Sequence, residues 1–457
     1  MELLTWTLER RQRCQRTFNA SERRVSSLYM QNTTLAEGAS VQRCLRCARE
    51  LTELDPRPQC PYCGGLLELR HALPAERGAA LVARFRASLS PSGVWRYGPL
   101  VLPGAAEAPI TWPEGNTPLI ARRRVAEWAG VPALQLKHEG LNPTGSFKDR
   151  GMTVGVTQAV RVGATAVACA STGNTGASLA AYAALAGLPA LVLVPAGKVA
   201  LGKLTQSLAY GARTLLVRGD FDDCLRLVRE ASEQLGVYLL NSVNPFRIEG
   251  QKTIVLEMLD QLQWDAPDWI ALPAGNLGNT AAFGKALREA RDLGLITNVP
   301  RLLAVQSDGA APFAMSYREN FRVRHRVRAN TIATAINIGA PASYQRAVQA
   351  IRETNGVVTS VSDGNIMEAK AVIDAAGVGC EPASAASVAG VRQMVLAGTI
   401  EPDARVVCVL TGHVLKDPES LDRYHRGTEP PPAHANRPIE IEATMSAVAR
   451  VMRTLRV

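Results

Sequence analysis

A repeated order of short apolar run, glycine-rich turn and helix constrains the fold of this chain more than any other feature. It occurs most clearly at residues 166–170 before the turn 171–176, and at residues 269–272 before the turn 275–280. Other apolar runs that predict strands are residues 134–139, 191–194, 214–217, 302–305 and 406–410. Strands separated by helices predict an α/β fold, in which parallel sheets carry helices on both faces.

One lysine lies in a turn of this kind. Lys148 belongs to the segment Pro-Thr-Gly-Ser-Phe-Lys-Asp-Arg-Gly at 143–151, between the strand at 134–139 and a predicted helix at 152–162. Open α/β sheets bind ligands at such strand-to-helix junctions, where a lysine can form a Schiff base. The alternative is a solvated charge beside Asp149 and Arg150.

The two glycine-rich turns change the balance between these interpretations. Ser171-Thr172-Gly173-Asn174-Thr175-Gly176 and Gly275-Asn276-Leu277-Gly278-Asn279-Thr280 each open a helix, so their backbone N–H groups can bind an anion. Alone, either turn is weak evidence, because glycine turns commonly just reverse the chain. Together with Lys148 they supply an amine for an aldehyde, a nest for a phosphate and an amide for a ring hydroxyl, which pyridoxal phosphate requires.

Longer motifs then point to one family. They are Gly115-Asn116-Thr117-Pro118-Leu119, the segment Asn-Ser-Val-Asn-Pro-Phe-Arg-Ile-Glu-Gly-Gln-Lys-Thr at 241–253, and Cys-Glu-Pro-Ala-Ser-Ala-Ala-Ser at 380–387. With Lys148 and the two turns, they resemble the threonine synthases, which belong to the β-family of pyridoxal-phosphate enzymes. The resemblance covers about residues 115–417. It implies a two-lobed, tryptophan-synthase-β-like fold whose smaller lobe runs from about 149 to 240.

The resemblance also implies the roles of individual residues. Lys148 would be catalytic and would carry the cofactor. The implied cofactor-binding residues are Lys148, Asn174, Gly275, Asn276, Leu277, Gly278, Asn279 and Thr411. The implied substrate-binding residues are Ser171, Thr172, Thr175, Ser242, Asn244 and Arg247. Thr411 lies in a further motif, Leu-Thr-Gly-His-Val-Leu-Lys at 410–416, where Val414 departs from the family pattern of glycine after the histidine.

The implied reaction converts O-phospho-L-homoserine and water to L-threonine and phosphate. Arg247 and Asn244 favour a phosphorylated substrate, although Arg247 has the alternative of an ion pair with Glu249. Related enzymes such as cysteate synthase or threonine dehydratase remain rival interpretations. A zinc-ribbon nucleic-acid-binding or regulatory protein with an inactive enzyme fold is a rival of another class, which the intact Lys148, Asn174 and 275–279 turn disfavour.

Four cysteines have the spacing of a metal site. Cys44, Cys47, Cys60 and Cys63 form two Cys-x-x-Cys pairs, and Gly64-Gly65 follow the second pair. Tetrahedral zinc accepts four thiolates from two such pairs, and four protein ligands leave no open position for catalysis. We therefore expect structural zinc, with two disulfides as the competing interpretation.

Composition limits the partners and the location. The net charge is +10, but the arginines are scattered, which suits an anionic small molecule better than nucleic acid. No apolar run is long enough to span a membrane, and no secretory signal is recognisable, so we expect a cytoplasmic protein. We also expect a homodimer.

The predicted organisation has five parts. They are an extension that is a candidate for disorder at 1–40, a zinc ribbon at 41–75, an arm at 76–114, the catalytic core at 115–430, and a tail at 431–457 with an amphipathic helix at 439–455. Met30 is an alternative start of the chain, and the sequence leaves this choice open.

Overall fold

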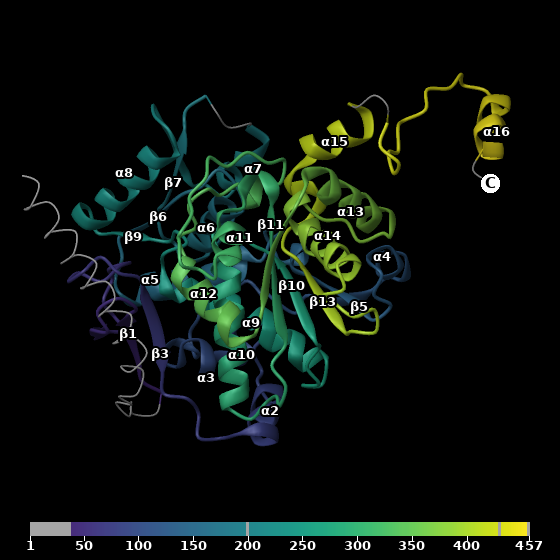
Figure 1. The fold of residues 1–457 in the computed structure, drawn as a ribbon. Coiled ribbons are helices and arrows are strands. Elements are labelled where there is room, and N and C mark those ends of the chain that lie inside the picture. Colours follow the sequence, from purple (N-terminus) through teal and green to yellow (C-terminus); the bar gives the residue numbers. More distant parts are fainter. Residues whose placement is uncertain (1–37, 198–200, 428–430, 455–457) are drawn as a thin grey trace, which may run out of the picture.

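The computed structural model describes residues 38–197, 201–427 and 431–454 (Figure 1). Three sheets organise these residues, with strand orders β12-β11-β10-β13-β5-β4, β8-β7-β6-β9 and β2-β1-β3. Nearly all of the extension predicted at 1–40 lies outside the described residues.

The six-stranded sheet is parallel apart from its edge strand β4. Its strands are β4 (Leu119–Ala121), β5 (Leu134–His138), β10 (Trp269–Pro273), β11 (Arg301–Ser307), β12 (Val357–Val361) and β13 (Val406–Leu410). Four of them fall on predicted apolar runs, so the parallel sheet inferred from the sequence is confirmed. The strands β4 and β12 were not predicted, because one is very short and the other contains Thr359 and Ser360.

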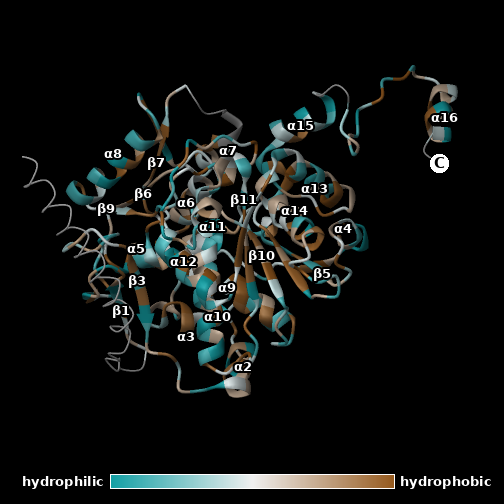
Figure 2. Ribbon diagram, viewed as in Figure 1, coloured by the Kyte–Doolittle hydropathy of each residue, from teal (hydrophilic) through white to brown (hydrophobic). Residues whose placement is uncertain are grey.

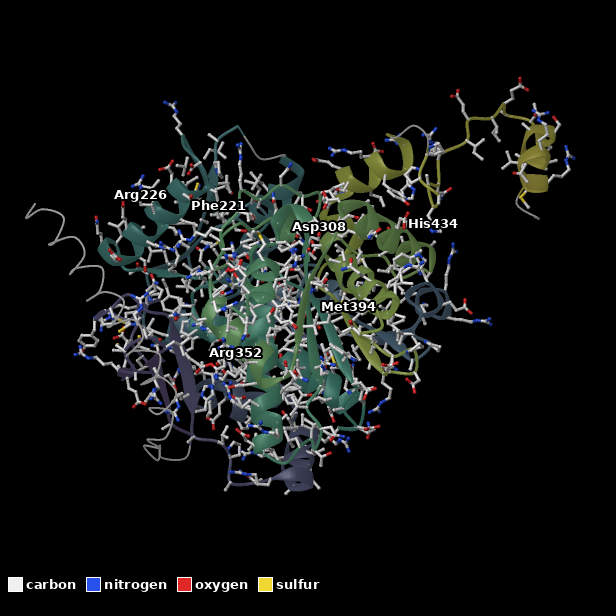
Figure 3. The ribbon with its side chains drawn as sticks, viewed as in Figure 1. Phe221, Arg226, Asp308, Arg352, Met394 and His434 are labelled. Carbon is white, nitrogen blue, oxygen red and sulfur yellow. The ribbon has the colours of Figure 1, made fainter. Side chains whose placement is uncertain are left out.

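Helices cover both faces of this sheet, because alternate side chains of each strand enter different cores. One core takes Ile270, Leu272, Leu302 and Ala304, and the other takes Trp269, Ala271, Leu303 and Val305. Figure 3 shows side chains on both sides of the sheet, with the exposed Arg352 of α12 (Tyr344–Glu353) on one side and the buried Met394 of α14 (Pro382–Leu396) on the other. The strands are hydrophobic, whereas outer helices such as α8 (Phe221–Gln234) and α15 (Pro418–Arg426) are largely hydrophilic (Figure 2).

The four-stranded sheet is parallel throughout. It contains β6 (Ala166–Ala170), β7 (Ala190–Pro195), β8 (Arg213–Val217) and β9 (Val237–Leu239). On one face Val167, Cys169 and Val192 share a core with α5 (Lys148–Arg161) and α6 (Asn174–Leu185). On the other face α8 supplies Cys224 and Val228.

The remaining helices connect or cover these sheets. They are α2 (Gly78–Arg86), α3 (Gly98–Val101), α4 (Arg123–Ala129), α7 (Leu201–Ala209), α9 (Pro245–Gln261), α10 (Gly278–Asp292), α11 (Pro312–Arg318), α13 (Asp363–Ala375) and α16 (Met445–Thr454), with short 3-10 turns at η2 (Trp95–Tyr97), η3 (Pro103–Ala105), η4 (Glu139–Leu141), η5 (Asp308–Ala310), η6 (Thr334–Ile336) and η7 (Val414–Lys416).

Two predicted helices have different starts. The helix predicted at 152–162 begins at Lys148, and the one predicted at 439–455 begins at Met445. In the second case Ile439 and Ile441 alternate with glutamates, which is a strand period and not a helix period, and the Thr444 hydroxyl then caps the helix by accepting from the Ala447 N–H.

The small N-terminal sheet is antiparallel. Its strands are β1 (Ser40–Cys44), β2 (Glu50–Thr52) and β3 (Leu67–His71). The segment 76–114 that follows packs more closely than its proline and glycine content indicates, because Trp95, Tyr97 and Leu100 are buried in the main core. The Trp95 indole N–H also donates to the Thr153 hydroxyl of α5 at 2.7 Å.

A buried ion-pair cluster joins the elements around Lys148. Arg150 contacts Glu139 at 2.7 Å and Glu257 at 2.9 Å, and Lys137 contacts Glu257 at 2.6 Å. All four side chains are almost fully buried. Two positive and two negative groups balance, so none is left as an unpaired charge. We call these four residues the Arg150 cluster.

We predict that Glu257→Gln lowers the free energy of unfolding by about 3–5 kcal/mol, because it leaves Arg150 and Lys137 with one carboxylate in a buried site. Urea denaturation followed by circular dichroism measures this change. The matched control is Glu230→Gln, which breaks an exposed pair with Arg226 and should cost less than about 0.5 kcal/mol. Equal losses in the two variants would contradict the role of the cluster.

Candidate active site

Lys148 is the first residue of α5 and lies half-buried behind a tight turn. Gly145 in that turn has φ +82°, a conformation that side chains other than glycine rarely adopt. The Lys148 Nζ lies 3.9 Å from the centre of the Phe147 ring. Burial, aided by the charge of Arg247, lowers the pKa of Lys148 to about 7, so a large share of the amine is unprotonated near neutral pH. An unprotonated amine is a nucleophile, which a solvated surface lysine is not.

Thr411, which follows β13, lies directly beside this turn. Its carbonyl oxygen accepts from the Phe147 N–H at 3.1 Å. Ser146 and Gly412 also pair as an isolated antiparallel β-bridge. The Thr411 hydroxyl donates to Glu381 at 3.2 Å and contacts the Ser384 hydroxyl at 3.0 Å. The structure therefore brings Thr411 next to Lys148 at the carboxyl end of the sheet.

Glu381 connects this group to the turn before α6. Its carboxylate accepts from the Asn174 side-chain amide at 3.0 Å. Burial raises the pKa of Glu381. A Cβ at position 412 would lie 2.5 Å from its carboxyl carbon, so a larger residue there would displace the carboxylate. Glu381 stood within the motif at 380–387 but was given no role from the sequence. A buried carboxylate between two predicted site residues was not visible in the pattern.

The turn Gly275–Asn279 wraps into the start of α10. Leu277 is buried and has φ +64°, which directs the chain sharply into the helix. A Cβ at Gly275 would lie 3.0 Å from the Ile336 Cα, and one at Gly278 would lie 3.1 Å from the Gln251 Oε1. The Asn276 side chain accepts from the Ala342 N–H and so holds the turn in place.

Several buried polar atoms of α9 and of the first turn of α10 have no hydrogen-bond partner among the described residues. They are Asn279 Oδ1, Thr280 Oγ1, Gln251 Oε1 and Arg247 Nε. Unpaired buried polar atoms are uncommon in folded proteins, and a bound ligand is one partner that such atoms can have. Gln251 also lies against Gly151, so α5, α9 and the 275–279 turn converge.

Arg247 lies in the first turn of α9 and is 2% exposed. Its Nη1 donates to the Leu240 carbonyl at 3.1 Å, and burial lowers its pKa to about 10, so it stays charged. The alternative ion pair with Glu249 does not form, because Glu249 points to His71, Lys252 and Lys285. The guanidinium is therefore a buried cation without a carboxylate partner among the described residues.

The other predicted substrate residues fall into two groups. Ser171, Thr172 and Thr175 lie half-buried on the turn before α6, and the Ser171 hydroxyl accepts from the Gly173 N–H. Ser242 is half-buried just before α9. Asn244 is the cap of α9: its Oδ1 accepts from the Phe246 N–H and its amide donates to the Leu239 carbonyl. Both ends of the Asn244 side chain are thus engaged with backbone groups.

Sequence reasoning gave no role to two further residues near Lys148. Asp149 accepts from Thr144 and Ser178, and burial raises its pKa to about 6. Lys416 reaches from η7 to the Gln206 side chain of α7 and lies against Gly145. It is in the same motif as Thr411, but a lysine in a loop carries no signal of such a contact.

The four cysteines of the N-terminal sheet form a separate cluster. Their sulfur atoms all lie within 4.8 Å of one another, with Cys44 and Cys63 at 3.4 Å and Cys47 and Cys60 at 3.6 Å. Sulfurs around one tetrahedral zinc lie about 3.8 Å apart, given Zn–S bonds of about 2.3 Å. All four cysteines are unpaired in the structure, and the predicted turn at Gly64 is present with φ +66°.

Comparison with known proteins agrees with this geometry. Residues 110–412 match the family described as "Pyridoxal-phosphate dependent enzyme". A threonine synthase of Methanosarcina acetivorans is 46% identical over 83% of this chain and 93% of its own length. One of Methanocaldococcus jannaschii is 42% identical over 91% of this chain and its full length.

A solved structure extends the comparison to the fold. The crystal structure of Escherichia coli threonine synthase covers 91% of this chain with a TM-score of 0.66, at 18% identity. The chain belongs to the pyridoxal-phosphate dependent enzymes, and within them to the threonine synthase family. Pyridoxal phosphate fits the residues present, since Lys148 supplies an amine and the glycine-rich turn 275–279 and unpartnered polar atoms lie where α5, α9 and α10 converge.

No helix among the described residues is long and apolar enough to cross a bilayer.

We predict that the rate at which the cofactor-free protein takes up pyridoxal phosphate rises with pH, with a midpoint near the Lys148 pKa of about 7. Uptake requires the unprotonated amine, and the absorbance of the attached cofactor reports it. Arg247→Gln removes a neighbouring positive charge, so the midpoint should shift to higher pH. A midpoint above about pH 10, as for a solvated lysine, would contradict the burial argument.

Proposed function

We propose that this chain converts O-phospho-L-homoserine and water to L-threonine and phosphate, the last step of threonine biosynthesis. The observation that carries the proposal is the buried Arg247, whose charged side chain has a donor without a partner among the described residues and lies close enough to Lys148 to help lower its pKa. The threonine synthase relatives support the same reaction. The reaction balances, because phosphate leaves from the γ-carbon of the substrate and water adds at its β-carbon to give threonine.

Bound pyridoxal phosphate would supply an electron sink for the carbanion at the substrate α-carbon. Lys148 would hold the cofactor and move protons at the α-carbon, which its lowered pKa favours. The N–H groups of the Gly275–Asn279 turn would bind the cofactor phosphate, and Thr411 would meet the ring nitrogen. Asn174 would donate to the ring hydroxyl in place of its present acceptor Glu381.

Two groups of residues would bind the substrate, one at the start of α9 and one on the turn before α6. Arg247 would bind the substrate phosphate, because a guanidinium forms forked, charge-assisted hydrogen bonds with phosphate. Ser242 and Asn244 lie near it in the sequence, and Asn244 would contribute mainly by capping α9. Ser171, Thr172 and Thr175 would bind the substrate carboxylate with hydroxyl and backbone N–H groups of the α6 turn.

We predict that the pyridoxal-phosphate-loaded protein releases threonine and phosphate in equal amounts from O-phospho-L-homoserine. Lys148→Ala should abolish turnover while leaving the circular dichroism spectrum unchanged. Arg247→Gln should raise KM by roughly 30- to 100-fold, because a charge-assisted pair is lost.

The matched control is Arg96→Gln, which changes an exposed contact with Asn116 and should leave KM unchanged. O-Phosphoserine and threonine serve as competing substrates. Turnover of only one of these would move the protein to a related reaction such as that of a cysteate synthase or a threonine dehydratase. Equal KM values for Arg247→Gln and wild type would remove Arg247 from the phosphate site.

We further propose that Cys44, Cys47, Cys60 and Cys63 bind a structural zinc ion. The sulfur distances support this more than they support disulfides, whose S–S bonds are about 2.0 Å long. Four thiolates close the coordination shell, so the metal would stabilise the small sheet and take no part in the reaction.

We predict about one zinc per chain in the purified protein by mass spectrometry of the metal, falling severalfold in Cys60→Ser. Cys224→Ala is the control, since Cys224 is buried elsewhere and should keep the zinc. Equal zinc content in the two variants, or none in the wild type, would contradict the site.

The organisation completes the proposal. We infer a zinc ribbon at about 41–75, an arm at 76–114, a catalytic core at 115–430 with a smaller lobe at about 149–240, and a tail at 431–457. The position of β6 to β9 between Ala166 and Leu239 supports the smaller lobe. A homodimer and a cytoplasmic location remain predictions.

A further inference from the structure

The cysteine-bearing sheet, residues 40–72, contacts the helices that carry the active-site residues. We call this sheet the ribbon. Its Glu53 carbonyl accepts from the Gln158 amide at 2.9 Å, and its Glu53 carboxylate pairs with Arg161, both on α5, which begins at Lys148. Its strand β3 contacts α9, which carries Arg247, and α10, which begins at Gly278.

A histidine makes one polar part of the contact with α9, beside the apolar packing of Leu69 in the core that contains Ile248. His71 is buried at the end of β3, and its Nε2 lies 3.1 Å from Glu249 of α9. Its Nδ1 lies 2.8 Å from the Ser40 hydroxyl of β1. Burial lowers the pKa of His71, so the ring is neutral, and the arrangement that satisfies both nitrogens has Nε2–H donating to Glu249 and Nδ1 accepting from Ser40.

Glu249 is the centre of this contact. It also accepts from Lys252 at 2.6 Å and from Lys285 of α10 at 2.5 Å, and Lys252 pairs with Glu289 at 2.7 Å. The two lysines and two glutamates balance, which agrees with a neutral His71. The imidazole therefore provides a directed hydrogen bond without adding charge.

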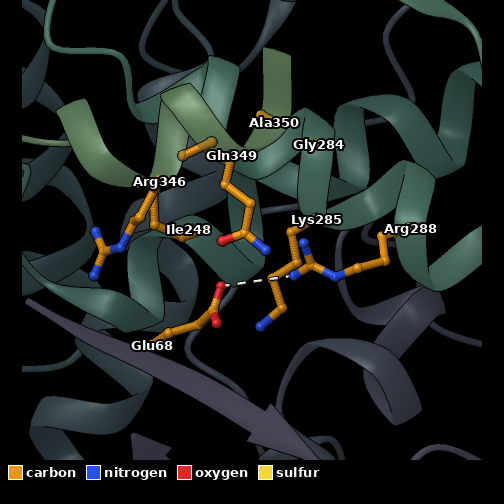
Figure 4. A pocket seen from close by; sticks show the side chains of 9 residues that line it. Glu68, Ile248, Gly284, Lys285, Arg288, Arg346, Gln349 and Ala350 are labelled. Atoms are coloured by element: carbon orange, nitrogen blue, oxygen red, sulfur yellow. Dashed lines mark ion pairs between the residues drawn. The ribbon is translucent and has the colours of Figure 1, made fainter. Parts of the chain in front are cut away.

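Strand β3 also contacts α10 and α12 beside the small pocket shown in Figure 4. The Leu69 carbonyl accepts from Lys285 at 2.6 Å, and Glu68 lies 3.7 Å from Arg288 of α10. The Leu67 carbonyl accepts from Arg346 of α12. The ribbon is thus attached to several helices of the core by polar contacts, most of them buried.

The first turns of α9 touch the first turn of α5, which begins at Lys148, at backbone distance. A Cβ at Gly250 would collide with the Arg150 carbonyl oxygen, and one at Gly151 would lie 3.1 Å from the Arg247 carbonyl oxygen. Gly250 adjoins Glu249, and Gly151 is three residues after Lys148. Arg247, two residues before Glu249, is on the turn that His71 holds.

We propose that His71 is a positioning residue, through which the ribbon fixes the first turns of α9 and so holds Arg247 in place for a phosphorylated substrate. The substrate part rests on the proposed function. The positioning part rests only on the contacts of His71, Glu249 and Gly250.

The test compares His71→Leu, His71→Gln and the control Arg70→Gln in the full-length, cofactor-loaded protein. Arg70 is the neighbouring residue on β3 and pairs with Glu50 inside the ribbon. His71→Leu should raise KM for O-phospho-L-homoserine about tenfold, with kcat changed less than about twofold, because one hydrogen bond to a charged group is lost. His71→Gln, whose amide can donate to Glu249 and accept from Ser40, should restore KM to within about threefold of wild type.

The proposal requires that KM rises while kcat changes little. A general loosening of the fold would instead change KM, kcat and the unfolding midpoint together. An unchanged KM in His71→Leu, or a joint loss of kcat, KM and stability that His71→Gln does not repair, overturns the proposal. If His71→Leu does not fold, Ser40→Ala replaces it and should raise KM about two- to threefold, whereas an unchanged KM overturns the proposal.

Hydrogen exchange separates this proposal from the proposed function, because it needs no substrate. In His71→Leu the amides of residues 247–252 should exchange faster than in wild type and in Arg70→Gln, while those of α13 stay unchanged. If wild type does not turn over O-phospho-L-homoserine but exchange changes in this way, the proposed reaction is wrong, whereas the proposed role of His71 in positioning α9 is confirmed. Unchanged exchange at 247–252 overturns the positioning.

Discussion

The position of Lys148 depends on the Arg150 cluster two residues away. Arg150 reaches from α5 to Glu139 after β5 and to Glu257 on α9, while Lys137 of β5 shares Glu257. The Arg150 cluster therefore joins β5, the helix α5 that begins with Lys148, and the helix α9 that carries Arg247. Because buried charges tolerate little displacement without loss of pairing, the backbone around Lys148 is set before any ligand arrives.

The same helices explain why the site combines rigidity with unpaired groups. Close contact between α5 and α9 requires Gly250, where a Cβ would collide with the Arg150 carbonyl oxygen. A Cβ at Gly151 or at Gly275 would lie within 3.1 Å of neighbouring backbone atoms. Around these glycines the backbone is crowded, yet Arg247, Gln251 and Asn279 keep buried polar atoms without partners among the described residues. Such atoms cost free energy in the free protein and become favourable only when a ligand pairs with them.

The sequence predicted those parts of the structure that local pattern controls. Apolar runs fell on seven strands, and the turns after β6 and β10 opened helices as expected, since glycine content and apolar periodicity are local properties. Strand β9 was missed because three residues give no period, and α16 began late because Ile439 and Ile441 follow a strand period. Glu381 could not be assigned, because its importance comes from Asn174 and Thr411, which are far away in the chain.

The contacts of β3 also bear on the order in which the chain assembles. His71 and Glu249 are 178 residues apart, and Leu67 and Arg346 are 279 apart. During folding, contacts between distant segments are expected to form late, because closing a long loop costs conformational entropy. The ribbon is synthesised before α12 but completes its contacts only after α12 exists. During synthesis, the buried strand β3 must therefore remain without some of its partners until a segment 279 residues further along the chain has formed.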